Sequence, residues 1–80
     1  MNNYQAHPYL DMPPHRNISL SKRETEVLAD YSCGLSRNEI AASRDISANT
    51  VKMVVFALFE KLRANNMPDA VRIAVQRKII

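Results

Sequence analysis

The chain has few of the residues that many functional sites need. Its 80 residues include one glycine, one cysteine and no tryptophan. A single cysteine excludes an internal disulfide, and the lack of a glycine-rich segment excludes a phosphate-binding loop. No apolar run is long enough to cross a membrane, and the N-terminus lacks the charged and then apolar order of a secretion signal. These absences favour a protein of the reducing cytoplasm.

The composition also argues against an enzyme. A chain of this size buries only about 60% of its unfolded surface, which leaves no room for a large catalytic cavity. No nucleophile stands at a recognisable spacing from a base, and no residues have the spacing of a metal site. Cys33 lies beside Gly34 and is expected to be an inert, partly exposed thiol. We therefore expect no catalytic residue, no metal and no cofactor.

Charge and helix signals are what the sequence does contain. Eleven Lys and Arg residues exceed eight Asp and Glu residues, which gives a net charge of +3. This excess suits a polyanionic partner, but it is weak evidence because the two signs are interleaved along the chain.

Three serines mark the beginnings of helices. Ser21 and Ser36 are each followed three residues later by a glutamate, which is the pattern of a capping box. Ser47 is a favoured N-cap, and residues 48–63 then run without Gly or Pro. These capping patterns predict helices that begin after each serine.

Helix ends and apolar spacing complete the outline. The first helix should stop at Gly34, since glycine adopts a left-handed conformation without strain. The second should cover residues 37–44, with Ile46 closing the turn before the third, and a fourth should begin around Pro68. Apolar residues recur at spacings of three and four throughout, so we predict an all-α domain over residues 20–80. Residues 1–19 hold three of the four prolines and show no period, which predicts an extended or disordered arm.

Several blocks of this sequence together resemble the LuxR-type (GerE-like) helix-turn-helix domain of bacterial transcription regulators. They agree with that family in order and spacing over Leu20 to about Ala74. The blocks are residues 20–28 (LSKRETEVL), 34–41 (GLSRNEIA), 46–52 (ISANTVK), 61–62 (KL) and 70–71 (AV).

The resemblance implies a four-helix fold in which the second and third helices form the helix-turn-helix. It implies that the third helix enters the major groove of double-stranded DNA and that the fourth commonly mediates dimerisation. An arm of nineteen residues is too short for an upstream sensing domain, so we expect a stand-alone, single-domain member.

The third helix offers a candidate DNA-reading surface. Val51, Val55, Leu58 and Leu62 form a buried seam at helical spacing, and the opposite side holds Asn49, Lys52, Met53, Phe56 and Glu60. Reading residues lie near the start of a recognition helix, so our DNA-binding candidates here are Asn49, Thr50, Lys52, Met53 and Phe56.

Each candidate has a specific chemistry and an alternative. Lys52 can donate to guanine O6 or N7 or to phosphate, and it is otherwise a solvated lysine. Met53 and Phe56 can pack against thymine methyl groups, which would favour A·T-rich sites, or they can belong to the core. Ser36 and Arg37 are candidates for phosphate contact at a helix N-terminus, or Ser36 only caps its helix.

Three positions depart from the family. Val54 stands where the resemblance implies a histidine, Ala57 where it implies a polar residue, and Arg44 where it implies a core leucine. The loss of polar groups removes possible phosphate contacts, so DNA binding should be weaker than usual or assisted. The run over residues 53–59 is expected to leave apolar surface on both faces of the helix.

The fourth helix is expected to turn Ala70, Val71 and Ala74 to the core. On a second side it places candidates for a homodimer interface, or else ordinary surface residues, which are Ile73, Gln76, Arg77 and Ile80.

Two functional hypotheses follow. The first is a DNA-binding transcription regulator that acts as a homodimer on a roughly palindromic site. The alternative is an interaction module that keeps the fold and acts as a heterodimer partner or antagonist of another regulator, because exposed apolar surface often marks a protein interface.

Overall fold

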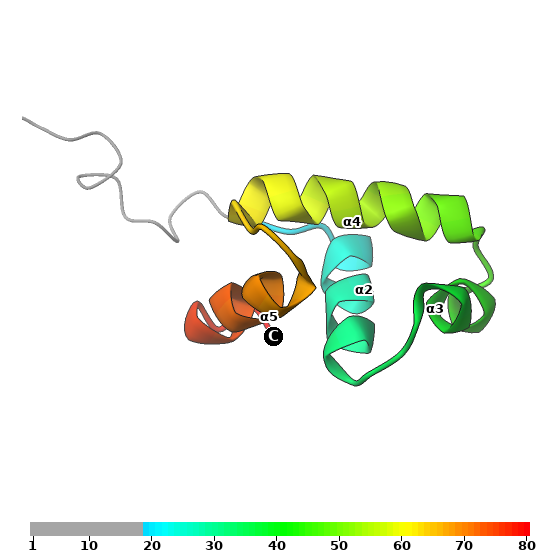
Figure 1. Cartoon of the computed structure of the whole chain (residues 1–80), viewed down its shortest axis with the longest axis horizontal. Coiled ribbons are helices and arrows are strands. Elements are labelled where there is room, and N and C mark those ends of the chain that lie inside the picture. The colour runs from blue at the N-terminus through cyan, green and yellow to red at the C-terminus, as the bar shows by residue number, and fades with distance from the viewer. Residues whose placement is uncertain (1–18) are drawn as a thin grey trace, which may run out of the picture.

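Residues 19–80 are the part of the chain that the structure, a computed structural model, describes. They form four α-helices and no strand, as Figure 1 shows. The helices are α2 (Lys22–Ser32), α3 (Arg37–Arg44), α4 (Ala48–Leu62) and α5 (Met67–Gln76). The predicted all-α fold is confirmed. The predicted N-terminal arm lies outside the described residues except for Ser19.

The three serines predicted to be N-caps stand at the beginnings of α2, α3 and α4. The Ser21 hydroxyl accepts the N–H of Glu24 at 3.0 Å, and the Glu24 carboxylate accepts the N–H of Ser21 at 2.8 Å. Ser36 and Glu39 make the same reciprocal pair at 3.2 and 2.7 Å. Ser47 caps α4 alone, because its hydroxyl accepts the N–H of Thr50 at 2.9 Å. Both predicted capping boxes are therefore confirmed.

The fourth helix begins slightly earlier than the sequence predicted. Asn66 is its N-cap and accepts the N–H of Asp69 at 2.8 Å, while Pro68 lies in the first turn. Proline is tolerated there because the first N–H groups of a helix have no intrahelical partner.

All four helices of residues 19–80 end in the same backbone motif. In each, a residue with positive φ is followed by an apolar residue whose N–H donates to a carbonyl five positions earlier. The four apolar residues pack against the core, and they are Leu35, Ile46, Ala64 and Ile79. This motif satisfies helix carbonyl groups and turns the chain back onto the apolar interior.

Only one of these helix ends uses glycine. Gly34 has φ of 93° and follows α2 as predicted, but Asp45, Arg63 and Lys78 adopt φ values of 56°, 56° and 59°. A left-handed conformation costs a non-glycine residue about 1–2 kcal/mol. These three positions were not predicted from the sequence, because the apolar residue that follows each one, not a glycine, marks the helix end.

The strain at Arg63 gives a stability prediction. We expect Arg63→Gly to raise the free energy of unfolding by about 0.5–1 kcal/mol, since glycine adopts φ of 56° without a Cβ penalty. Chemical denaturation followed by circular dichroism measures this change. Arg63→Ala is the control and should change little, because alanine keeps the Cβ. A destabilised glycine variant would contradict the prediction.

The core lies between α4 and the other three helices. α4 spans the domain in Figure 1, with α3 near its N-terminal end, α5 near its C-terminal end and α2 between them. Of the predicted seam, Val51, Leu58 and Leu62 are buried and Val55 is half-buried. No helix within residues 19–80 is long and apolar enough to cross a membrane.

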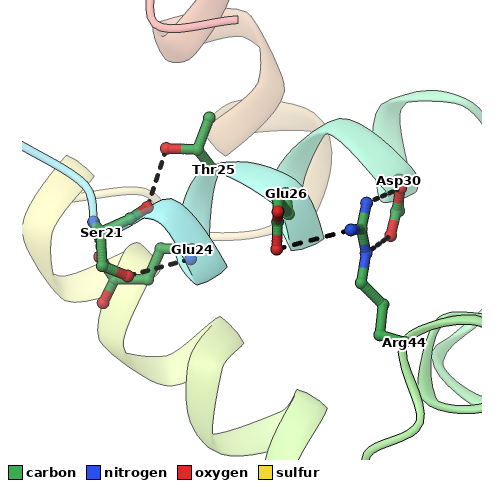
Figure 2. A network of polar contacts seen from close by, with 6 residues as sticks. All are labelled: Ser21, Glu24, Thr25, Glu26, Asp30 and Arg44. Carbon is green, nitrogen blue, oxygen red and sulfur yellow. Dashed lines mark hydrogen bonds and ion pairs between the residues drawn. The ribbon is translucent and has the colours of Figure 1, made fainter.

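An ion-pair cluster takes the place of the leucine that the family resemblance implies at Arg44. The Arg44 guanidinium donates to both carboxylate oxygens of Asp30, at 2.8 and 3.0 Å, and lies 3.5 Å from Glu26, as Figure 2 shows. The hydrogen bonds from Arg44 lower the pKa of Asp30 below its ordinary value of 3.8, although burial opposes them. The end of α3 is therefore held to α2 by charge.

A second ion pair joins α2 to α4. Glu24, which is buried, accepts from the Lys61 ammonium group at 2.8 Å with the same oxygen that accepts the Ser21 N–H. Burial raises the pKa of Glu24, but hydrogen bonds from Lys61 and Ser21 lower it by more, so it lies below 4.5. One carboxylate thus caps α2 and connects it to the far end of α4.

These carboxyl groups predict acid sensitivity. A carboxyl group whose pKa is lower in the folded chain stabilises the fold above its unfolded pKa, and this contribution disappears as the pH falls through the folded pKa. For Glu24 and Asp30 the loss begins near their ordinary values of 4.5 and 3.8 and is complete below their folded pKa values.

We therefore expect the free energy of unfolding to fall between pH 5 and pH 3, measured by urea denaturation across that range. Glu24→Gln is the matched variant, because the amide keeps the shape but does not titrate. It should be less stable at pH 7 and should lose less stability on acidification. Equal pH dependence in both proteins would contradict the assignment to Glu24.

Candidate nucleic-acid interface

One side of α4 is open to solvent along its length. Met53 and Phe56 are 57% and 55% exposed, and the neighbouring polar residues Asn49, Lys52 and Glu60 are also exposed. The prediction that these residues lie opposite the seam is confirmed. Their contact with DNA stays a prediction.

The N-terminal end of α4 differs from those of the other helices. The first turns of α2, α3 and α5 contain Glu24, Glu39 and Asp69, whereas the first turn of α4 holds no carboxylate. A helix N-terminus carries a partial positive charge that attracts anions. This end of α4, where Asn49 and Thr50 are exposed, is therefore electrostatically suited to approach phosphate groups.

Lys52 has no carboxylate partner within residues 19–80. By contrast, Arg44, Lys61 and Arg72 each pair with an acidic side chain at 3.5 Å or less. The Lys52 ammonium group lies 5.7 Å from the centroid of the Phe56 ring. Its charge is therefore available to an external acceptor.

The start of α3 supplies a second exposed cation. Ser36 and Arg37 are both exposed, but the Ser36 hydroxyl already accepts the Glu39 N–H. Arg37 has no carboxylate partner among residues 19–80, so its guanidinium is free for phosphate. Of this predicted pair, Arg37 is the stronger candidate for a contact.

The apolar run of residues 53–59 is less exposed than the sequence suggested. Val54, Val55 and Phe59 are half-buried and pack against the core, so the second face of α4 exposes less apolar surface than the sequence predicted. The exposed apolar surface of this run comes from Met53 and Phe56. The third helix, α4, thus has one exposed side that carries Met53 and Phe56 and one side that packs against the core.

The predicted interface on α5 needs one correction. Ile73 is only 8% exposed and belongs to the core, so it cannot lie on a free surface stripe. The exposed apolar residues near it are Val75, at 55%, and Ile80, at 36%, with Gln76 also exposed and Arg77 half-buried. The helical spacing placed Ile73 and Ile80 together, but α5 ends at Gln76, so Ile80 lies beyond the helix, and Ile73 lies on the side of α5 that packs into the core.

No metal site accompanies this surface. Within residues 19–80 no three His, Cys, Asp or Glu side chains are placed to hold a metal ion. Cys33 is exposed and unpaired. The groups that this surface offers are an ammonium, a guanidinium, an amide, a hydroxyl and two apolar side chains, which suit non-covalent recognition of a nucleic acid.

Comparison with known proteins gives the family. The model of the GerE family, described as bacterial regulatory proteins of the luxR family, matches residues 18–74. The CsgBAC operon transcriptional regulatory protein of Escherichia coli is 46% identical over 52 residues, which cover 65% of this chain and 24% of that protein. The transcriptional regulatory protein FixJ of Bradyrhizobium diazoefficiens is 36% identical over 61 residues, which cover 76% of this chain and 30% of that protein.

A further relative extends the match. The transcriptional regulatory protein YdfI of Bacillus subtilis is 36% identical over 70 residues, or 86% of this chain and 33% of that protein. The chain thus spans a quarter to a third of the length of these relatives. No solved structure matches it significantly. By its four capped helices and the family match over residues 18–74, this chain belongs to the luxR family of bacterial regulatory proteins.

Proposed function

We propose that this protein is a DNA-binding transcription regulator in which α4 reads the major groove of double-stranded DNA. The observation that carries the proposal is the exposed face of α4, where Lys52 has no carboxylate partner and the first turn holds no acidic residue. Family membership supports it, since the relatives are named as transcriptional regulatory proteins. No covalent chemistry is involved.

The proposed DNA-binding surface contains residues for phosphate contact and residues for base contact. Arg37 and the N-terminal end of α4 are suited to hold phosphates and so to orient the domain on the duplex. Asn49 can pair with adenine and Lys52 with guanine, while Met53 and Phe56 can pack against thymine methyl groups. Recognition thus combines a few polar contacts with an apolar surface.

We also propose that the protein binds as a homodimer through the exposed side of α5. Val75 is the exposed large apolar residue of α5, with Gln76 beside it, and Ile80 is exposed beyond the end of the helix. A twofold dimer places two copies of α4 against half-sites about one DNA turn apart, which predicts a roughly palindromic operator.

The test is the affinity of Lys52→Ala for a DNA site selected by the wild-type protein from a random duplex library. We expect a loss of about 5- to 150-fold in a mobility-shift assay, since one good base contact is worth about 1–3 kcal/mol. Arg63→Ala is the matched control. It removes one positive charge at the opposite end of α4, about 16 Å further along the helix, and should bind nearly as well as wild type.

Two results would contradict the proposal. The first is a wild-type protein that enriches no sequence from the library. The second is a Lys52→Ala protein that binds the selected site as tightly as wild type.

A second candidate function is an interaction module that binds another regulator. It is favoured by the exposure of Met53 and Phe56 on α4, because two large apolar side chains there suit a protein partner as well as thymine methyl groups. Phe56→Asp and Val75→Asp test this reading by co-purification with partner regulators. If neither variant disturbs any protein complex, the interaction-module function is rejected and DNA binding is the one that remains.

A further inference from the structure

Lys52 and Phe56 are held together on the open face of α4. They are four residues apart, which places them one turn apart on the same side of the helix. The Lys52 Nζ lies 5.7 Å from the centroid of the Phe56 ring, within the distance of about 6 Å at which a cation is attracted to an aromatic face. Phe56 is 55% exposed and Lys52 is exposed, so the pair is in solvent and not part of the core.

The ring constrains the ammonium group without using its hydrogen-bond donors on a carboxylate. Lys61 and Arg72 donate to acidic side chains at short distances, and these contacts neutralise their charges. An aromatic face attracts a cation by its quadrupole and carries no charge, so the Lys52 ammonium keeps its full charge and N–H groups for an outside acceptor. A long lysine side chain is normally mobile, and the ring reduces that freedom before any ligand arrives.

We propose that Phe56 is a positioning residue for Lys52, and that the two side chains read DNA as a single unit. This inference rests on the proposed DNA-binding function of α4. It predicts that Lys52 selects a base edge and does not merely hold a phosphate. It also assigns Phe56 two roles, to orient the ammonium group and to offer an apolar ring edge to the neighbouring base.

The chemistry of the unit identifies its target. In the major groove, guanine presents two acceptors, O6 and N7, that suit an ammonium donor, and thymine presents a methyl group that suits an aromatic edge. Bases along one strand are about 3.4 Å apart, so an ammonium nitrogen and a ring centroid that are 5.7 Å apart reach adjacent base pairs or the next but one. The unit is therefore specific for a guanine with a thymine at one of those positions.

The first test is a double-mutant cycle on the DNA site selected by wild type. The proteins are wild type, Lys52→Ala, Phe56→Leu and the double variant, where leucine keeps an apolar side chain but removes the aromatic face. We expect the effect of Lys52→Ala to be about two- to five-fold smaller in the Phe56→Leu background, which corresponds to the strength of an exposed cation–π contact. Phe56→Tyr keeps the aromatic face and should preserve the coupling.

The second test changes single atoms of the DNA. Replacing guanine by 7-deazaguanine removes one acceptor, and replacing thymine by deoxyuridine removes only the methyl group. We expect the guanine change to weaken wild type but not Lys52→Ala, and the thymine change to weaken wild type more than Phe56→Leu. NMR of the free proteins tests the contact without DNA. The ring current of Phe56 should shift the Lys52 side-chain resonances in wild type and not in Phe56→Leu.

The outcomes separate this inference from the proposed function. Additive effects in the cycle, or full guanine discrimination by Phe56→Leu, overturn the inference while DNA binding stands. The inference is also overturned if Lys52→Ala loses affinity for all DNA sequences equally and the salt dependence of its binding falls by about one in slope, since Lys52 then contacts phosphate. If wild type selects no sequence at all, the proposed function fails and the inference fails with it.

Discussion

Leu58→Ala is expected to lower the free energy of unfolding by about 2–5 kcal/mol, the usual cost of truncating a fully buried leucine. Leu58 has no exposed surface and lies on the buried side of α4, which contacts all three other described helices. The lost methyl groups leave a cavity that the short helices around it cannot close without moving. Urea denaturation followed by circular dichroism at 222 nm measures the change.

This loss is large for such a domain. Native proteins are stable by only about 5–15 kcal/mol, and a chain of this size buries less of its surface than most, so Leu58→Ala should leave a measurable unfolded fraction at 37 °C. Met53→Ala is the control on the same helix. Met53 is 57% exposed, and its truncation should cost no more than about 0.5 kcal/mol. Equal costs at the two positions would mean that α4 packs by a different face.

Val75→Asp is expected to convert the protein to a monomer and to weaken binding to a full palindromic site by about 100-fold or more. Val75 is 55% exposed on α5, and a carboxylate there would be buried without a partner in a twofold interface. Two linked α4 helices gain affinity because the second binding event is intramolecular, and that gain is about 10²–10⁴. Analytical ultracentrifugation and mobility-shift titration measure the two effects.

A single half-site is the control for this experiment. Val75→Asp leaves α4 intact, so it should bind an isolated half-site as tightly as a wild-type monomer does. Its circular dichroism spectrum should also match wild type, because Val75 does not belong to the core. A Val75→Asp protein that is still dimeric would place the interface elsewhere, for example on Met53 and Phe56.

The starts of three helices and the end of α2 could be read from local chemistry. Ser21, Ser36 and Ser47 cap helices as their spacing predicted, because a capping hydroxyl and its target N–H are only three residues apart. Gly34 ends α2 for an equally local reason, since its φ of 93° suits a residue without a side chain. Such contacts depend on neighbours in the chain and need no knowledge of the fold.

The ion pairs could not be read in this way. Arg44 and Asp30 are fourteen residues apart, and Lys61 and Glu24 are thirty-seven apart, on helices whose relative angle no sequence pattern states. The sequence shows the four charged residues, but which of them pair depends on how α2 packs against α3 and α4. Arg44 stands where the family resemblance implied a core leucine, and its contacts with Asp30 and Glu26 explain how a half-buried position there holds a charge.

The sequence by itself determined the four helices, the seam of α4 and the exposed face opposite it, because helical periodicity places residues on one side or the other of a single helix. Tertiary structure decided how much of the remaining surface of α4 and α5 is covered by neighbouring helices. It buried Ile73, half-buried Val54 and left Val75 exposed, since exposure depends on the angle at which a neighbouring helix crosses. It also decided which cations pair with acidic side chains, and Lys52 has no carboxylate partner within residues 19–80 because none of the described helices brings one within reach.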